Sequence, residues 1–433
     1  KILHSILIVF VLSLFYIPVF VWGFSLLKVV GSYWYRYSYI GIITLIVIAA
    51  EFFSVKDQET NTRALMWKAT AVAGLVLFFM EYVKPLGKPF NVYMTVLAFI
   101  ATMLFTDILF WTKRVSVKRI VIFLMAVTVS TELVYNAKLI MTLDGGVEHF
   151  TQYAEDEMKL IGQLQQQDGG FYRINQTSTR DVDGNKLTAN YNEGIAYNYK
   201  SISGYTSDPD RNQLLFMKQM GYAICGDVMN VVNTSVLGAD SILGVKYVLS
   251  SYDIPGLKKL ENIEPGNGKS VYYNPYALPV AFTYESSNML PDSEEKDEFL
   301  YQNQLFSYLS GQNVQVNKRI EAEPKADSNT VGYDVKHMDD PVYGYFNMKD
   351  KDGGKVYVDD QYVTLYNTWL CPRVVYIPQQ PDAPSTHVHI DGDNMENRVE
   401  SACFYYTDLN ELEKVTQKIQ DRREDGLLIQ DGS

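Results

Sequence analysis

Cysteine and histidine are scarce in this sequence, whose 433 residues include 3 Cys and 5 His. Cys225, Cys371 and Cys403 are too few and too scattered for a disulfide framework or a zinc site. One bridge between Cys371 and Cys403 is compatible with an exported domain. His387 and His389 share one face of an expected strand without a third ligand nearby, so they indicate a surface strand rather than a metal site.

Known catalytic and nucleotide-binding motifs are missing as well. The sequence contains no G-x-S-x-G, no P-loop, no H-E-x-x-H and no C-x-x-C. The stretch from Asp181 to Asn185 begins like a calcium loop, but Lys186 stands at the required Gly and Asn192 at the bidentate Glu. A tight turn explains it, and motifs alone therefore assign neither a catalytic site nor a metal ligand.

Basic residues are scarce in the larger part of the chain. Residues 1–141 carry 13 Lys+Arg and 6 Asp+Glu, whereas residues 142–433 carry 25 and 44. Proteins that bind nucleic acid need an excess of Lys and Arg to neutralise phosphates, so the acidic part argues against such a partner. The change of composition near residue 141 indicates two parts of different kinds.

The first part consists largely of long apolar runs. A membrane helix needs about 20 apolar residues, and Lys/Arg clusters mark the cytoplasmic side. Lys113, Arg114, Lys118 and Arg119 directly precede the last run, so everything after residue 141 is expected outside the cytoplasm. The predicted localisation is a bacterial plasma membrane with several spans, and the lipid bilayer is the first predicted partner. The five runs are residues 2–24, 34–53, 65–83, 90–111 and 120–141.

The second part alternates helical and strand patterns up to residue 311. Helices are predicted at 148–167, from 206–209 to 221, at 293–309 and at 408–423, and strands at 171–174, 245–250, 271–273 and 280–284. After residue 311, short β-prone runs separated by Asp, Gly and Asn indicate a β-sandwich. The predicted fold is an α-helical multi-span membrane bundle (1–141), an extracytoplasmic α+β domain (142–312) and a β-sandwich-like domain (313–433).

Charged residues within the expected spans are site candidates, because a charge at membrane depth is costly unless it faces a bundle interior or a wet cavity. Glu81 and Glu132 lie toward the outer side, where a general base would meet an acceptor arriving from outside. Pairing between helices or snorkelling explains the same residues. Arg36 beside Trp34, in the first outward loop, suits a lipid phosphate and a stacked sugar ring; an interfacial aromatic belt is the alternative.

A stretch rich in Tyr, Asn and Ser follows the helix at 148–167. Such residues combine flat apolar faces with amide and hydroxyl groups, which suits contact with sugars. An ordinary arrangement of strands and turns accounts for the same residues. The residues singled out as substrate-binding are Tyr172, Arg173, Asn190, Ser203 and Tyr205.

The chain resembles the YfhO family of bacterial membrane proteins. The resemblance covers most of the chain and rests on Trp34-Tyr35-Arg36, residues 171–174, Asn190, 201–207, 238–240, 243–249 and 277–279. That family is similar to the C-type membrane glycosyltransferases. The resemblance implies transfer of a sugar from an undecaprenyl-phosphate carrier to an extracellular envelope glycopolymer, lipoteichoic acid in Gram-positive members.

The resemblance also implies a catalytic carboxylate in the first outward loop near the amino terminus. This chain begins inside an apolar run and is expected to be a fragment that lacks that loop, so no residue takes the role. No cofactor is indicated by the residues. Transfer of this kind is metal-assisted or base-assisted, which leaves a divalent metal ion as one alternative for the full-length protein. The rival hypothesis is a non-enzymatic envelope protein that binds a glycan or partner, or that assists flipping of lipid-linked sugars.

Overall fold

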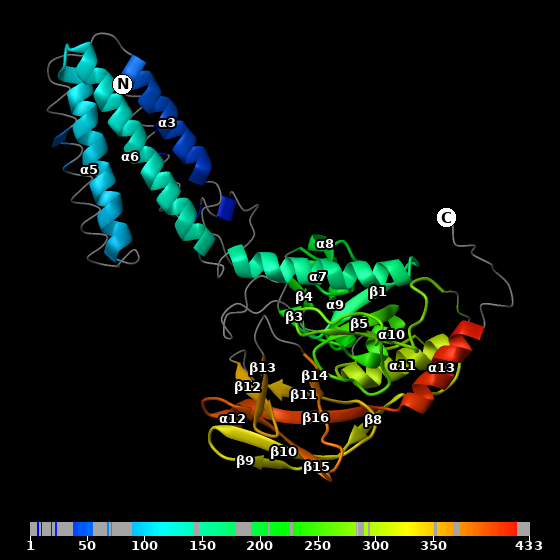
Figure 1. Ribbon diagram of the computed structural model, residues 1–433. Coiled ribbons are helices and arrows are strands. Elements are labelled where there is room, and N and C mark those ends of the chain that lie inside the picture. The colour runs from blue at the N-terminus through cyan, green and yellow to red at the C-terminus, as the bar shows by residue number, and fades with distance from the viewer. Residues whose placement is uncertain are drawn as a thin grey trace. The chain divides into compact units, whose positions relative to one another are not determined.

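The computed structural model contains two compact units, Lys1–Lys138 and Leu139–Ser433 (Figure 1). A division of the second unit at residue 312 stays a prediction. The described residues are 38–54, 89–142, 147–178, 192–206, 208–222, 224–225, 228–231, 233–282, 284, 290–292, 295–349, 353–366 and 373–421, with isolated positions 7, 10, 19, 22, 23, 67, 68 and 71.

The first unit is helical. Its described helices are α3 (Ser38–Ser54), α5 (Pro89–Trp111) and α6 (Val115–Thr142), which contain most of three of the five apolar runs. Among the described residues, one segment, Val115–Lys138, is a helix long and apolar enough to cross a membrane. The runs at 2–24 and 65–83 lie outside the described residues apart from isolated positions, so the multi-span arrangement stays a prediction.

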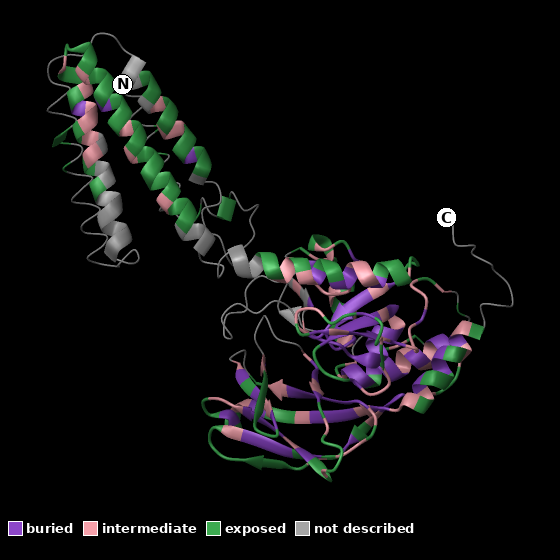
Figure 2. Cartoon of the chain, in the orientation of Figure 1, coloured by how far each residue is buried: buried purple, intermediate pink, exposed green. Residues whose placement is uncertain are grey.

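Apolar side chains cover the outside of α6 instead of a buried core. Phe123 is 67% exposed and Val134 is 69% exposed, and exposed residues predominate on α3 and α6 in Figure 2. A helix that is apolar all round is stable when lipid or other helices surround it. This pattern fits a membrane-embedded helix.

The second unit begins with α7 (Val147–Gln167), as the apolar periodicity predicted. Leu160, Ile161 and Leu164 are buried on one face of the helix. The helix ends at Gln167, and the carboxylate of the next residue, Asp168, accepts a hydrogen bond from the Gly170 amide at 2.9 Å. This buried face packs in one hydrophobic cluster with the first sheet.

That first sheet has the strand order β1-β5-β7-β6. Strand β1 pairs in parallel with β5, and β7 is antiparallel to both β5 and β6. Strands at 245–250 and 271–273 are confirmed, whereas the strand predicted at 171–174 begins two residues later. The bounds are β1 (Arg173–Gln176), β5 (Val245–Ser250), β6 (Lys258–Lys259) and β7 (Ser270–Tyr273).

The strand predicted at 280–284 is wrong, because none of its described residues is in a strand. This segment instead packs against the turn before β5. Gly244 has φ +69°, and a Cβ there would lie 3.1 Å from the Leu278 carbonyl oxygen and 3.1 Å from Val280. The apolar composition of this segment serves a contact with the turn at Gly244 and not a strand. The hydrophobic periodicity of the sequence does not reveal such a contact.

Two of the predicted helices begin later than the sequence indicated, because an aspartate nearer to the helix provides the cap. Asp210 accepts hydrogen bonds from the Asn212 and Gln213 amides, and Asp297 caps the later helix in the same way. The helices between β1 and β5 in the chain are α8 (Glu193–Ala196), α9 (Arg211–Gln219) and α10 (Leu237–Ile242), and α11 (Glu298–Ser310) follows β7. A small sheet joins β2 (Gly204–Thr206), β4 (Val228–Val231) and β3 (Ile224–Cys225).

The last part of the chain forms two further sheets that pack together. Tyr333 of the five-stranded sheet contacts Phe346 and Phe404 of the four-stranded sheet, with ring centres 6.2 and 5.3 Å apart. The five-stranded sheet comprises β13 (Gln361–Tyr366), β12 (Gly354–Val358), β15 (Ser385–Asp391), β10 (Thr330–Lys336) and β9 (Pro324–Ala326). The four-stranded sheet that packs on it comprises β14 (Val375–Ile377), β11 (Val342–Met348), β16 (Val399–Thr407) and β8 (Asn317–Ile320).

The core of these two sheets continues into the preceding helical region. Phe299 and Phe306 of α11 belong to the same buried cluster as the strand residues. The last helix, α13 (Leu409–Asp421), follows a short α12 (Met395–Arg398) and strand β16, and it buries Leu412, Val415 and Ile419 in that cluster. The described elements from α11 to α13 are therefore held by one continuous core.

Candidate functional site

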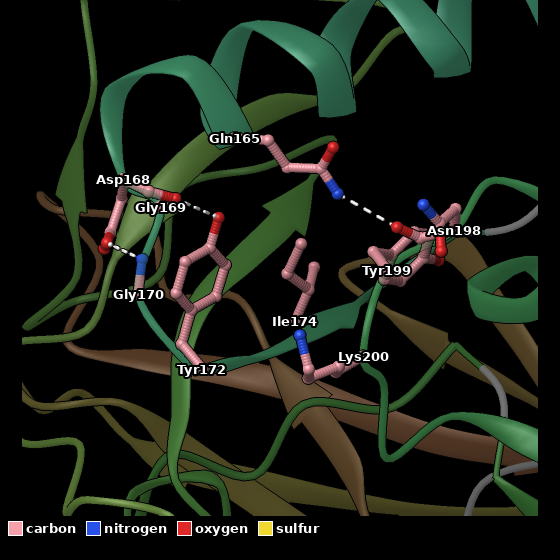
Figure 3. A pocket seen from close by; sticks show the side chains of 9 residues that line it. All are labelled: Gln165, Asp168, Gly169, Gly170, Tyr172, Ile174, Asn198, Tyr199 and Lys200. Atoms are coloured by element: carbon pink, nitrogen blue, oxygen red, sulfur yellow. Dashed lines mark hydrogen bonds between the residues drawn. The ribbon is translucent and has the colours of Figure 1, made fainter. Parts of the chain in front are cut away.

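A polar hollow of about 370 Å³ lies where α7 ends and β1 begins. Three short segments build it: the last turn of α7, the lead into β1, and residues 198–200. The Ile174 amide donates to the Lys200 carbonyl at 2.8 Å, which places the third segment beside β1. The lining residues, shown in Figure 3, are Gln165, Asp168, Gly169, Gly170, Tyr172, Ile174, Asn198, Tyr199 and Lys200.

Gln165 and Asn198 connect two sides of this pocket. The Gln165 side-chain amide donates to the Asn198 carbonyl at 2.9 Å (Figure 3). Asn198 has φ +55°, a left-handed conformation that Asn adopts more readily than most residues. Both residues are exposed. The Oε1 atom of Gln165 and the side-chain amide of Asn198 have no hydrogen-bond partner among the described residues, so they can serve a ligand.

Asp168 is a fixed wall of the pocket. Its Oδ2 accepts hydrogen bonds from Lys246 at 2.5 Å and from the Tyr247 hydroxyl at 2.9 Å. Burial opposes ionisation, but the hydrogen bonds from Lys246, Gly170 and Tyr247 outweigh it and hold the pKa of Asp168 below its usual value. Because both carboxylate oxygens are engaged, Asp168 shapes the site and is poorly placed to abstract a proton.

Two tyrosines form the inner wall. Tyr172 donates its hydroxyl to the Asp168 carbonyl at 3.0 Å and packs edge-on against Tyr247 with ring centres 5.0 Å apart. Burial and the charge of Asp168 raise the pKa of Tyr172. Burial also raises the pKa of Tyr199 far above its usual value. Both hydroxyls therefore stay protonated at neutral pH.

Lys200 supplies the positive charge of the rim. Its Nζ lies 4.7 Å from the ring centre of Phe171, which is 68% exposed. This distance is typical of a cation–π contact, and it leaves the ammonium group accessible to an anion. Lys246, whose Nζ lies 5.7 Å from the ring centre of Tyr172, is paired with Asp168.

A buried network supports the pocket from below. The Gln176 amide donates to the Tyr199 hydroxyl at 3.2 Å and to a Glu193 oxygen at 2.8 Å. Its carbonyl oxygen accepts from Lys269 at 3.0 Å, so the amide orientation is determined. Lys269 in turn pairs with Glu157 at 2.9 Å. Burial raises the pKa of Glu193, although the charge of Lys269 and the hydrogen bond from Gln176 oppose the shift.

A second buried network surrounds Asp240 on α10. Asp240 accepts from the Tyr222 and Ser235 hydroxyls, each at 2.6 Å, and from the Asn175 amide at 2.9 Å. Ser203 donates to Asn175 at 2.6 Å. Burial raises the pKa of Asp240 to about 6, although the three hydrogen bonds oppose the shift.

The structure places the predicted substrate-binding residues in different surroundings. Tyr172 lines the pocket. Arg173 donates to the Leu243 carbonyl at 2.6 Å, Ser203 joins the Asp240 network, and the Tyr205 amide donates to the Asn192 side chain at 2.8 Å. All three are hydrogen bonds to other residues of the protein. Asn190 lies outside the described residues.

Most of the site residues predicted in the membrane part lie outside the residues that the structure describes. Trp34, Arg36 and Glu81 lie outside the described residues. Glu132 is exposed on α6, whereas Asp107 on α5 is 8% exposed. Of these ionisable groups, only Asp107 is thus shown turned inward, and the sequence did not favour it over the others.

Several pocket residues were not predicted as site residues. In the sequence, Asp168-Gly169-Gly170 marks only the end of a helix, and residues 197–200 are only part of a stretch rich in Tyr and Asn. The hydrogen bond between Lys200 and Ile174 of β1 brings these two segments together in space. In the portions of the chain that are described, no group of three or more His, Cys, Asp or Glu residues is arranged to hold a metal ion, and His387 instead contacts Asp334 at 2.8 Å.

Comparison with known proteins gives one result at the family level. The model of a family described as bacterial membrane protein YfhO matches residues 1–421. Neither the curated proteins nor the solved structures yielded a match. The match covers both compact units, including the whole pocket.

Proposed function

Because the chain belongs to the YfhO family of bacterial membrane proteins, we propose that it is part of a membrane glycosyltransferase. In this proposal a sugar moves from an undecaprenyl-phosphate carrier to an extracellular polymer such as lipoteichoic acid. The observation that carries it is the family match over residues 1–421, since this family is associated with membrane glycosyltransferase-like function. The proposed orientation leaves the second unit outside the cytoplasm.

The pocket supports the proposal with the right chemistry for an acceptor. Amide groups of Gln165 and Asn198 both donate and accept hydrogen bonds, which suits sugar or polyol hydroxyls. Lys200 adds a charge that attracts an anionic group such as a phosphodiester. The proposed occupant of the pocket is therefore a hydroxyl-rich unit of the acceptor polymer.

The carrier is proposed to bind the first unit. Arg36 would hold the carrier phosphate, and Trp34 would pack against its sugar or lipid. Glu81 and Glu132 remain proposed general bases within the spans. Several spans across the bacterial plasma membrane are part of the same proposal.

A binding role without catalysis is the second candidate function. One observation favours it: both carboxylate oxygens of Asp168, the acid that lines the pocket, are engaged by protein donors. In this alternative the second unit binds an envelope glycan while the spans anchor it. The two proposals differ in whether the polymer is chemically changed.

The deciding experiment compares lipoteichoic acid by mass spectrometry from cells with and without the complete gene. Transferase activity predicts the loss of one sugar mass per modified repeat in the deletion strain. Complementation with Arg36→Met should fail to restore that mass, whereas Arg36→Lys should restore part of it. Identical spectra from all strains, with normal protein levels, would reject the transferase proposal for this polymer.

A further inference from the structure

The pocket is built entirely from the second unit. All its lining residues lie between Gln165 and Lys200, whereas the proposed carrier-binding residue Arg36 belongs to the first unit. Between the helices of the two units, α6 ends at Thr142 and α7 begins at Val147. The pocket is therefore formed without any residue of the unit that contains Arg36.

From this arrangement we propose that the pocket is a holding site for an internal repeat of the acceptor polymer and is not the place of reaction. The inference rests on the proposed function. It assigns the pocket a ligand class, a chain of hydroxyl-rich repeats with anionic groups, and a task, the retention of that chain.

The open rim suits an internal repeat better than a chain end. Gln165, Gly169, Gly170, Asn198 and Lys200 are all exposed. At Gly169 an added Cβ would meet nothing within 4 Å, so the rim has open space there. A chain can enter and leave over such a rim without threading its end through the protein.

The chemistry of the walls suits retention without reaction. Asp168 is engaged by Lys246, Tyr247 and the Gly170 amide. Both tyrosines stay protonated because burial raises the pKa of each hydroxyl. The groups left to a ligand are the amides of Gln165 and Asn198 and the ammonium of Lys200, which bind but do not transfer a sugar.

A holding site changes the kinetics in a specific way. Once one repeat is bound, the other repeats of the same chain reach the reaction centre at an effective concentration set by the connecting chain, on the order of millimolar. The pocket should therefore lower KM for long polymers, leave kcat unchanged, and have no effect on an acceptor with a single repeat.

The test uses the full-length enzyme in membranes with two acceptors, lipoteichoic acid fractionated for long chains and glycerol phosphate as a single repeat. The variants are Lys200→Met and Asn198→Gly, the latter keeping the left-handed backbone while removing the amide. Lys258→Met, at an exposed lysine of β6, is the matched control, and Lys200→Arg retains the charge.

We expect KM for the long acceptor to rise about tenfold in the two pocket variants, with kcat unchanged and single-repeat kinetics unaffected. Lys200→Arg should recover most of the affinity, and Lys258→Met should match wild type. Equal losses on both acceptors, or a fall in kcat, would make the pocket part of the reaction centre. Unchanged kinetics in both pocket variants would also overturn the proposal.

Failure of the proposed function is seen separately, as absence of transfer by the wild-type enzyme. In that case a binding measurement still tests the pocket. The full chain in nanodiscs should retain fluorescent lipoteichoic acid more strongly as chain length increases, and Lys200→Met should remove that dependence. Retention that is independent of length, or equal in wild type and Lys200→Met, would end the holding-site proposal.

Discussion

Lys269 and Glu157 form an ion pair 2.9 Å long whose side chains are 1% and 0% exposed. Lys269 also donates to the Gln176 side chain at 3.0 Å and to the Tyr153 hydroxyl at 3.2 Å. The pair thus joins α7 to the residue before β7 and, through Gln176, to the end of β1. Glu157 binds Lys269 through Oε1, and its Oε2 accepts a hydrogen bond from the Asn267 side-chain amide at 2.8 Å.

Breaking this pair should strongly destabilise the protein. Lys269→Met leaves Glu157 buried without its counter-charge, which is expected to lower the free energy of unfolding by about 3 to 5 kcal/mol. The double variant Lys269→Met/Glu157→Leu removes both charges and should recover much of that loss. Chemical denaturation of the second unit within the full chain measures both; a single variant as stable as wild type would contradict the prediction.

A comparison of two ion pairs tests the effect of burial. Lys246–Asp168 and Lys159–Glu264 are both 2.5 Å long, but the second pair is 63% and 70% exposed, against 38% and 18% for the first. We expect Lys159→Met to leave the free energy of unfolding unchanged, because solvent screens this exposed pair, and Lys246→Met to cost about 1 kcal/mol or more. Equal effects in thermal unfolding would show that Asp168 gains nothing from its partial burial.

The raised pKa of Asp240 makes stability depend on pH. In the folded protein burial raises its pKa to about 6, while an unfolded Asp titrates near pH 4. Between these values the folded state holds a proton that the unfolded state has released, so the free energy of unfolding falls as pH rises, by on the order of 3 kcal/mol.

Asp240→Asn should flatten that slope between pH 4 and 6, because the position no longer titrates. The variant also alters the hydrogen bonds with Tyr222 and Ser235, so its overall stability falls at every pH. Asp382→Asn, at an exposed site, serves as the control and should keep the wild-type slope. Denaturation series at several pH values give the measurement, and parallel curves for wild type and Asp240→Asn would refute the assignment.

Two glycines predict opposite effects of the same substitution. A Cβ at Gly344 would lie 2.7 Å from the Phe404 ring and 3.0 Å from Ile377, inside the core of the two sheets. Gly344→Ala should therefore cost about 1 to 3 kcal/mol. Gly162 lies within α7 with nothing near its Cβ position, so Gly162→Ala should stabilise by about 0.5 to 1 kcal/mol. Melting temperatures of the two variants should move in opposite directions.

Elements with strong local signals were predicted well. The apolar periodicity of α7 and the charged, amphipathic α13 depend on neighbours three and four residues apart, and both helices are confirmed. Helix starts were less certain: several polar residues precede α9 and α11, and the cap is the one whose side chain reaches the free amides. The apolar run at 280–284 has strand composition but packs against the turn at Gly244.

The sequence by itself determined the membrane character of the first part, the acidic second part and the family. These properties are sums over residues or patterns along the chain, and they do not depend on which distant segments meet. The tertiary structure alone decided that Asp168, Tyr172 and Lys200 share a pocket, that Arg173 donates to the Leu243 carbonyl and that Ser203 donates to Asn175. Pairing of residues 198–200 with β1, and burial of Lys269 beneath them, arise from contacts between segments far apart in sequence, whose partners no local pattern specifies.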